Sequence, residues 1–110
     1  MQDRKLPDLT HLQFLVLGVL LTGEQSGRTL RRAIEEYGIG RSAPAFYQMM
    51  ARLERDGLVE GWYEQVQTGD QAVTERRYRT TAAGSRMWRQ TRAFYEMVSL
   101  GVARRRWSNA

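Results

Sequence analysis

The sequence changes character within residues 74–84, TERRYRTTAAG, and this change limits the folds that the chain can adopt. The first half places polar side chains and three arginines, Arg76, Arg77 and Arg79, around one tyrosine, a composition that suits an exposed strand. The second half is Thr81 followed by two alanines and a glycine, which is typical of an N-cap and the first turn of a helix. A strand must therefore run directly into a helix, and this strand needs a partner.

The preceding segment supplies that partner. Residues 58–67, LVEGWYEQVQ, are rich in valine and aromatic residues, as strands are, and residues 68–71, TGDQ, suit a turn. A turn centred near Asp70 predicts two contacts across the hairpin, an aromatic pair and an ion pair. These pairs are Trp62 with Tyr78 and Glu64 with Arg76. The sequence therefore predicts a basic β-hairpin that leads into a helix capped by Thr81.

Two helical segments stand at the start of the chain. Thr10 and Gln13 form a capping box for residues 11–21, which are apolar nearly all round; this pattern predicts a helix at the centre of the core. Ser26 caps a second helix, which ends at Gly38 and buries one face. The predicted buried stripe of this second helix is Leu30, Ala33, Ile34 and Tyr37.

A third helix follows after a short turn. It opens with Ser42 as its N-cap and Pro44 in its first turn, and it ends at Gly57. Its predicted buried face is Phe46, Met49, Met50 and Leu53, and its outward face is Tyr47, Gln48, Ala51, Arg52 and Arg55. Helix, turn and helix followed by a two-stranded ribbon indicate a winged helix-turn-helix. We therefore predict a mainly α fold with a small β-hairpin, in the α+β class.

The fourth helix runs from its cap Thr81 to about Arg104, longer than a domain of this size needs to cover its own core. Its predicted interface stripe is Met87, Thr91, Phe94, Val98 and Val102. An apolar patch of this length on a monomer is usually an interface, so we expect a homodimer. The expected organisation is a DNA-binding winged helix-turn-helix in residues 1–81 and a dimerisation helix with a basic tail in residues 82–110, forming one structural unit.

Charge is unevenly placed along the 110 residues. Residues 1–73 carry 8 Lys and Arg against 10 Asp and Glu, whereas residues 74–110 carry nine arginines and two glutamates, so the net charge of +5 comes from the C-terminal third. A basic block of this kind is either a solvated face or an electrostatic footprint for phosphate. Charge alone leaves both interpretations open.

Other classes of protein find little support in the sequence. It has no cysteine, one histidine at His11, no cluster with metal-ligand spacing and no glycine-rich phosphate loop. We therefore predict no enzyme activity, no metal and no cofactor. The most apolar run, residues 12–21, is about half the length of a bilayer span, and the N-terminus lacks the pattern of a signal peptide. A cytoplasmic protein without membrane contact is expected.

The third helix and the hairpin also resemble a known family. Residues 46–64, FYQMMARLERDGLVEGWYE, and residues 75–88, ERRYRTTAAGSRMW, are similar to the winged helix of PadR-like transcriptional regulators. The matching positions are Tyr47, Arg52-Leu53-Glu54, Gly57-Leu58-Val59, Tyr78-Arg79, Thr81 and Gly84. This resemblance implies a dimeric repressor of transcription, and many such regulators release their operator when a small aromatic compound binds.

Double-stranded DNA is accordingly the expected partner. A recognition helix reads base edges in the major groove, while basic side chains hold phosphates. The predicted DNA-binding residues are Ser42, Tyr47, Gln48, Arg52, Arg55, Arg76, Arg77 and Arg79. Two of these have a simpler interpretation, because Arg52 can pair with Asp56 and Tyr47 can be a packed surface aromatic. The alternative function is a winged helix that binds protein or RNA without operator specificity.

Trp88 and Tyr95 lie seven residues apart, two turns along one side of the fourth helix. They either pack on the chain's own core or on a dimer partner, or they form a flat aromatic slot for a small planar effector. Both interpretations stay open on sequence alone.

Overall fold

The computed structural model describes residues 8–108, which form four helices and a small antiparallel sheet. In chain order the elements are α1 (His11–Leu20), β1 (Gln25–Ser26), α2 (Gly27–Glu36), α3 (Ala43–Arg55), β2 (Val59–Thr68), β3 (Gln71–Thr80) and α4 (Ala82–Ser108). The predicted α+β winged helix with a long C-terminal helix is confirmed.

Among the described residues, no helix has both the length and the apolar character needed to cross a membrane. Nor does this part of the chain gather three or more His, Cys, Asp or Glu side chains that could hold a metal ion.

Side-chain caps begin the first three helices where the sequence predicted them. Thr10 Oγ1 accepts from the backbone N–H of Gln13 at 3.1 Å, and Gln13 Oε1 accepts from the backbone N–H of Thr10 at 3.0 Å. These two bonds complete the predicted capping box of α1. Ser26 and Ser42 cap α2 and α3, each with its hydroxyl oxygen accepting a backbone N–H three residues ahead.

The core lies where α1 meets the inner faces of α2, α3 and the base of the hairpin. Its buried apolar residues are Leu12, Val16, Leu17, Leu20, Leu30, Ile34, Phe46, Met50, Leu53, Val59 and Tyr78. Tyr37, which the pattern placed in the buried stripe of α2, is instead 68% exposed. The reason is that α2 ends at Glu36, so Tyr37 is already its C-cap and leaves the helical repeat.

The hairpin pairs one residue out of the predicted register. Thr68 lies opposite Gln71, so the turn contains only Gly69 and Asp70. Gly69 has a φ of 64°, the left-handed conformation that glycine supplies at the first position of a two-residue hairpin turn. The turn is therefore centred between Gly69 and Asp70 and not on Asp70, which moves every pairing by one residue.

The two predicted cross-strand contacts, Trp62 with Tyr78 and Glu64 with Arg76, are wrong for this reason. The observed pairs are Gly61 with Tyr78, Trp62 with Arg77, Tyr63 with Arg76 and Glu64 with Glu75. Successive side chains of a strand point to opposite faces, so a shift of one residue puts the predicted partners on different faces of the hairpin.

A third strand, β1, was not predicted. Gln25 and Ser26 pair antiparallel with Tyr78 and Arg77, and the strand order is β1-β3-β2. Ser26 has extended backbone angles, φ −71° and ψ 156°, so the same residue ends the strand and caps α2. Two residues are too few to show an alternating pattern in the sequence. Their pairing makes β3 the central strand, which is bonded to β2 along one edge and to β1 at its base on the other.

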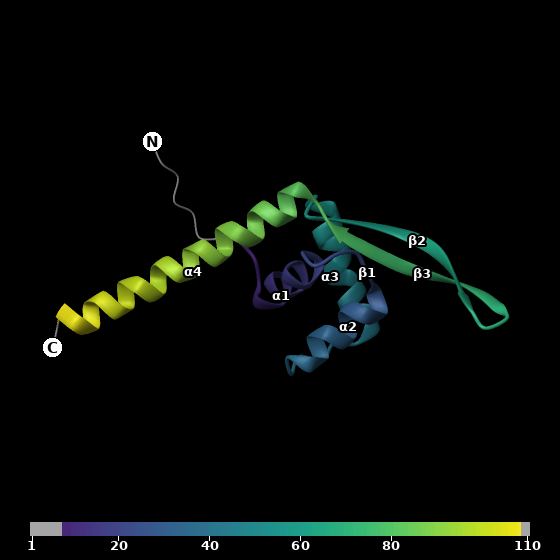
Figure 1. The fold of residues 1–110 in the computed structure, drawn as a ribbon, viewed down its shortest axis with the longest axis horizontal. Coiled ribbons are helices and arrows are strands. Elements are labelled where there is room, and N and C mark those ends of the chain that lie inside the picture. Colours follow the sequence, from purple (N-terminus) through teal and green to yellow (C-terminus); the bar gives the residue numbers. More distant parts are fainter. Residues whose placement is uncertain (1–7, 109–110) are drawn as a thin grey trace.

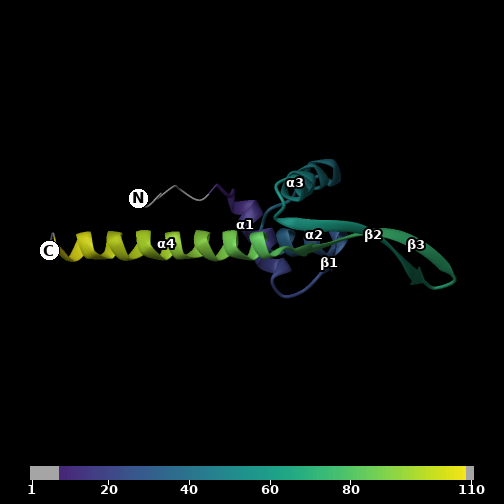
Figure 2. The same ribbon diagram turned by 90° about the horizontal axis from the view of Figure 1, so that it is seen from above.

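Thr81 lies at the junction between β3 and α4 and caps α4, as the sequence predicted. Thr81 Oγ1 accepts the backbone N–H of Gly84 at 3.0 Å and donates to the carbonyl of Gly57 at 2.7 Å, which ties the start of α4 to the end of α3. The first part of α4 packs against α1. The remainder projects from the helical body in the direction opposite to the hairpin (Figure 1 and Figure 2). The molecule is consequently elongated, 67 Å by 33 Å by 23 Å.

Candidate nucleic-acid interface

The outward face of α3 is open to solvent, as predicted. Its exposed residues are Tyr47, Gln48, Ala51, Arg52 and Arg55. No ion pair joins Arg52 to Asp56, and within residues 8–108 neither Arg52 nor Arg55 has a carboxylate partner. Ser42, at the start of the helix, uses its hydroxyl to accept the backbone N–H of Ala45 at 3.3 Å. This face therefore presents an amide and two uncompensated guanidinium groups.

Gln48 and Arg52 also line a shallow cavity of about 580 Å³ between α3 and the N-terminal end of α1. Thr10 and Arg41 lie on its other sides. An amide and two guanidinium groups around one hollow can pair with base edges and phosphate oxygens. Arg41 was missed by the sequence analysis. Its position directly before the N-cap Ser42, at the positive end of a helix, was the available clue.

Tyr47 lies partly against α2. A Cβ atom on Gly27 would lie 2.6 Å from the hydroxyl oxygen of Tyr47, so the tyrosine covers the first residue of α2. Its ring also packs edge-on against Phe46, with centroids 5.1 Å apart. Tyr47 remains 37% exposed. The packed-aromatic interpretation thus describes the ring, while part of the side chain still faces solvent.

The hairpin of β2 and β3, which we call the wing (residues 59–80), is not the basic ribbon that the sequence suggested. It carries three arginines and four carboxylates, a net charge of −1. The arginines are Arg76, Arg77 and Arg79, and the carboxylates are Glu60, Glu64, Asp70 and Glu75. The prediction placed one glutamate of the first strand, Glu64, beside an arginine, whereas pairing sets Glu60 beside Arg79 and Glu64 beside Arg77. Each wing arginine has a carboxylate partner.

Arg76 points toward α3. Its Nη2 donates to both carboxylate oxygens of Glu54, at 2.7 and 2.9 Å. The guanidinium carbon lies 4.6 Å from the ring centroid of Tyr63 and 5.5 Å from that of Tyr78. Gly61 leaves room for the pair, since a Cβ there would lie 2.8 Å from both Arg76 Nη2 and Glu54 Oε1. Burial acts to lower the pKa of Arg76, but the hydrogen bonds and charge of its neighbours outweigh it and raise the pKa.

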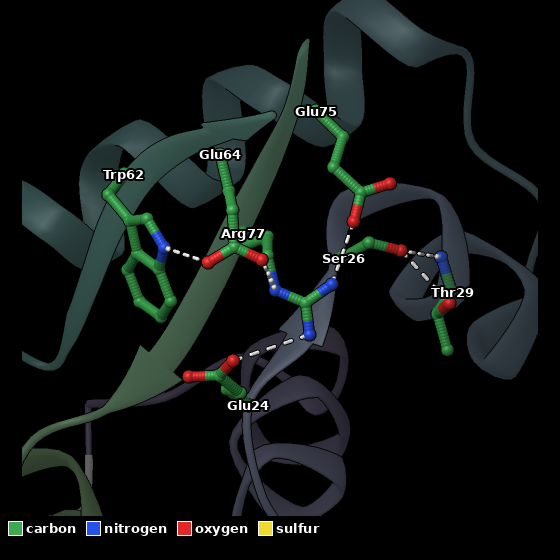
Figure 3. A network of polar contacts seen from close by, with 7 residues as sticks. All are labelled: Glu24, Ser26, Thr29, Trp62, Glu64, Glu75 and Arg77. Carbon is green, nitrogen blue, oxygen red and sulfur yellow. Dashed lines mark hydrogen bonds and ion pairs between the residues drawn. The ribbon is translucent and has the colours of Figure 1, made fainter. Parts of the chain in front are cut away.

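Arg77 points to the opposite face of the wing and is enclosed by three carboxylates (Figure 3). Its Nη1 donates to Glu75 Oε2 at 2.7 Å, and its Nη2 lies 3.5 Å from Glu24 Oε1. Its Nε lies 3.5 Å from Glu64 Oε2, close enough for an ion pair but without a hydrogen bond. Trp62 Nε1 donates to Glu64 Oε1 at 3.3 Å and holds that carboxylate in place. The hydrogen bond with Glu75 is the main cause of the raised pKa of Arg77.

Arg79 is the most accessible of the three wing arginines. Its Nη2 and Nε donate to Glu60 Oε2 at 2.8 and 3.1 Å, and its guanidinium carbon lies 5.3 Å from the ring centroid of Trp62. The side chain is 58% exposed. An exposed ion pair of this kind contributes little to stability, so Arg79 can exchange Glu60 for another anion at small cost.

The stripe on α4 that the sequence assigned to a dimer divides into two parts. Thr91 is only 1% exposed, and its hydroxyl donates to the carbonyl of Met87 at 2.7 Å, so Thr91 lies inside this chain and not on an open face. Met87 and Phe94 are half-buried. Val98 and Val102 are exposed, because this part of α4 lies beyond the helical body. Among the side chains of α4 that the structure describes, the other large exposed apolar residues are Tyr95, Met97 and Leu100.

The two aromatic residues proposed as an effector slot have different surroundings. Trp88 stacks on Phe14 of α1, with ring centroids 5.2 Å apart and planes inclined by 4°. A Cβ atom on Gly18 would lie 2.9 Å from Trp88 Nε1, so the indole also covers this glycine. Tyr95 is exposed and lines a second shallow cavity, of about 540 Å³, together with Phe14 and Leu100. Trp88 thus packs on the chain's own core, whereas Tyr95 faces a cavity.

A capped helix with an open polar face, set beside a two-stranded wing, defines a winged helix-turn-helix protein. Solved structures share this fold. A PadR family transcription regulator from hypervirulent Clostridium difficile R20291 superposes with a TM-score of 0.73 at 14% identity, over 86% of this chain and 97% of that chain. Bacillus subtilis PadR in complex with operator DNA gives a TM-score of 0.61 at 20% identity, over 74% of this chain and 46% of that chain.

A solved structure with a sequence more similar to this chain shows the family to which the chain belongs. The structure of a PadR family transcriptional regulator from Eggerthella lenta DSM 2243 is 30% identical over 82% of this chain and 79% of that chain, with a TM-score of 0.60. The chain belongs to the PadR family of transcriptional regulators, which confirms the resemblance carried by the third helix and the wing. The sequence matches no family model, and no curated protein matches it.

Proposed function

We propose that the protein is a dimeric transcriptional repressor that binds a palindromic operator in double-stranded DNA. The observation that carries the proposal is the open face of α3, where Gln48, Arg52 and Arg55 are exposed and the two arginines have no carboxylate partner in the described chain. The similar fold of Bacillus subtilis PadR, which was solved with operator DNA, supports the same kind of partner.

In the proposed complex α3 enters the major groove. Gln48 makes a bidentate contact with adenine, and the exposed part of Tyr47 lies beside it. The proposed phosphate contacts are Arg41, Ser42, Arg52, Arg55 and Arg79. Affinity then comes chiefly from the helices, because the wing has no net positive charge. Arg76 and Arg77 are held by carboxylates of this chain, and we assign them a different part in binding.

The projecting part of α4 is the proposed dimer contact, formed by Phe94, Val98 and Val102 at the positions predicted from the sequence, with Met87 at its margin. Met97 and Leu100 add exposed apolar surface on the same helix. A second copy across a twofold axis would cover this surface and set two α3 helices about 34–36 Å apart, one turn of DNA. Residues 1–81 would then bind DNA and residues 82–110 would hold the dimer together.

A small planar aromatic compound is the proposed effector. The cavity of about 540 Å³ beside Phe14 and Tyr95 offers an aromatic face, and Trp88 supports that face by stacking on Phe14. The cavity lies next to the proposed dimer contact on α4, so a ligand there would favour one packing of the two copies over another. Such differential binding is the condition for coupling the effector to DNA release.

Selection of duplexes from a random library, followed by affinity measurements across salt concentrations, tests the proposal. An enriched inverted repeat is expected, bound with a steep salt dependence. Arg52→Ala should make the log–log salt slope shallower by about 0.9, the value for one lost phosphate contact. Arg105→Ala, at the far end of α4, is the matched control and should leave the slope unchanged.

Two outcomes would overturn the proposal. Failure to enrich any duplex sequence, with binding to DNA that is weak and uniform, would favour a winged helix that binds a protein. Equal or tighter binding to RNA of the same sequence would favour an RNA-binding module.

A further inference from the structure

We propose that Arg76 and Arg77 position the wing against the helical body and make no contact with DNA. The two residues are neighbours on β3 and point to opposite faces of the sheet, so they hold one strand from both sides. This inference rests on the proposed DNA-binding function, because it concerns how the wing meets DNA. It separates these two arginines from Arg79, the third cation of the same strand.

On one face, Arg76 joins the wing to α3. A single nitrogen, Nη2, donates to both oxygens of Glu54, and the side chains of Arg76 and Glu54 are only 22% and 28% exposed. Charge-assisted hydrogen bonds in partly buried surroundings are among the stronger polar contacts in a protein. Rotation of the wing away from α3 would break them. The Arg76–Glu54 pair therefore fixes the angle between the wing and the proposed recognition helix.

On the other face, Arg77 joins the wing to the loop before α2. Its three carboxylates come from three segments: Glu24 from the loop between α1 and β1, Glu64 from β2 and Glu75 from β3 (Figure 3). The backbone of Arg77 also pairs with Ser26 of β1. Side chain and backbone thus tie β3 to the same stretch of chain between α1 and α2.

The electrostatics of this cluster disfavour a phosphate contact. One guanidinium among three carboxylates leaves a net charge of −2, and only 20% of the Arg77 side chain is exposed. An approaching phosphate would meet the carboxylates together with the cation, and like charges at this range repel. Arg79 differs in both respects, since it has one carboxylate partner and its side chain is 58% exposed.

Three methionine variants test the assignment. Methionine keeps the apolar stem of an arginine and removes its charge. Arg76→Met and Arg77→Met should each weaken operator binding by about tenfold or more, the scale of a lost charge-assisted hydrogen bond, with the salt slope unchanged. Arg79→Met, the matched control on the same strand, should make the slope shallower by about 0.9. A slope that becomes shallower by this amount in Arg77→Met would overturn the inference for Arg77, and the same result in Arg76→Met would overturn it for Arg76.

Neutralising the carboxylates around Arg77 should change operator affinity in opposite directions, depending on whether Arg77 positions the wing or binds phosphate. In a protein that keeps Arg77, Glu64→Gln with Glu75→Gln should weaken operator binding, because the arginine loses what holds it. In the Arg77→Met background the same two changes should restore part of the binding, since removing both sides of an ion pair costs less than removing one. If Arg77 held phosphate, the two changes would free it, and binding would become tighter with a steeper salt slope. That result would overturn the inference.

A measurement without DNA separates this inference from the proposed function. Backbone amide exchange in residues 25–26 and 76–78 should be faster in Arg77→Met than in the wild-type protein or in Arg79→Met. Unchanged amide exchange in these residues would refute the positioning role, even if the protein binds an operator. If Arg77→Met does not fold, Arg77→Met with Glu64→Gln and Glu75→Gln takes its place, and failure of that variant to fold also counts against the inference. A wild-type protein without salt-dependent duplex binding would refute the proposed function alone.

Discussion

Replacing Gly84 with alanine should destabilise the protein, although alanine is the better residue for a helix. Gly84 lies in the first turn of α4, where alanine would normally gain about 1 kcal/mol over glycine. A Cβ atom at this position, however, would collide with the carbonyl oxygen of Leu58 and with Thr80 Oγ1. The Leu58 carbonyl accepts the backbone N–H of Thr81 at 3.1 Å, so it cannot move without weakening the junction between the wing and α4.

The cost follows from these contacts. Overpacking of this kind costs about 1–3 kcal/mol, and a weakened backbone hydrogen bond adds about 0.5–1.5 kcal/mol. After subtracting the gain in helix propensity, we expect Gly84→Ala to lower the free energy of unfolding by roughly 0.5–3.5 kcal/mol. The melting temperature should fall by roughly 4–8 °C for each kcal/mol.

Urea and thermal unfolding at one fixed protein concentration measure this change. Gly40→Ala is the matched control, because a Cβ on Gly40 meets no atom within 4 Å and its φ lies outside the left-handed region. That variant should stabilise the protein by about 0.4–1 kcal/mol through the entropy of the unfolded chain. A Gly84→Ala protein as stable as the wild type, with an unchanged denaturant slope, would refute the steric argument.

Three further predictions concern binding. Gln48→Ala should weaken binding to the best operator by about 1–3 kcal/mol and relax the preference at one base pair, whereas a uniform loss across site variants would contradict base readout. Deletion of residues 97–110 should leave a folded but monomeric winged helix with far weaker binding to a palindrome; a light-scattering mass that still corresponds to a dimer would contradict the role of α4. Planar aromatic compounds should quench tryptophan fluorescence and release DNA, and a panel that does neither would remove the case for a ligand beside Phe14 and Tyr95.

The sequence alone was sufficient for the helices and for the general architecture. The caps at Thr10, Ser26, Ser42 and Thr81 were predictable because each hydroxyl bonds to a backbone N–H three residues ahead. The outward face of α3 was predictable for a similar reason, since helical spacing decides which side chains share a face. The motif shared with the PadR family predicted the remaining order of elements, from α3 through the wing to α4.

The partners of the wing arginines could not be predicted in this way. Glu54 is 22 residues from Arg76 in the chain, and Glu24 is contributed by a loop beside a two-residue strand that has no pattern of its own. Centring the turn on Asp70 in place of the point between Gly69 and Asp70 was enough to assign Glu64 to Arg76 when it lies beside Arg77, because neighbouring side chains point to opposite faces of a strand.

What the sequence by itself determined was therefore most of what depends on neighbours within one or two helical turns: the helix starts, the buried stripes apart from Tyr37 at the end of α2, and the open face of α3. Only the tertiary structure decided which carboxylate pairs with each wing arginine, that Thr91 is buried and that Trp88 stacks on Phe14. The physical reason is range. A cap depends on spacing along one helix, whereas an ion pair between distant segments depends on strand register and on how whole elements dock.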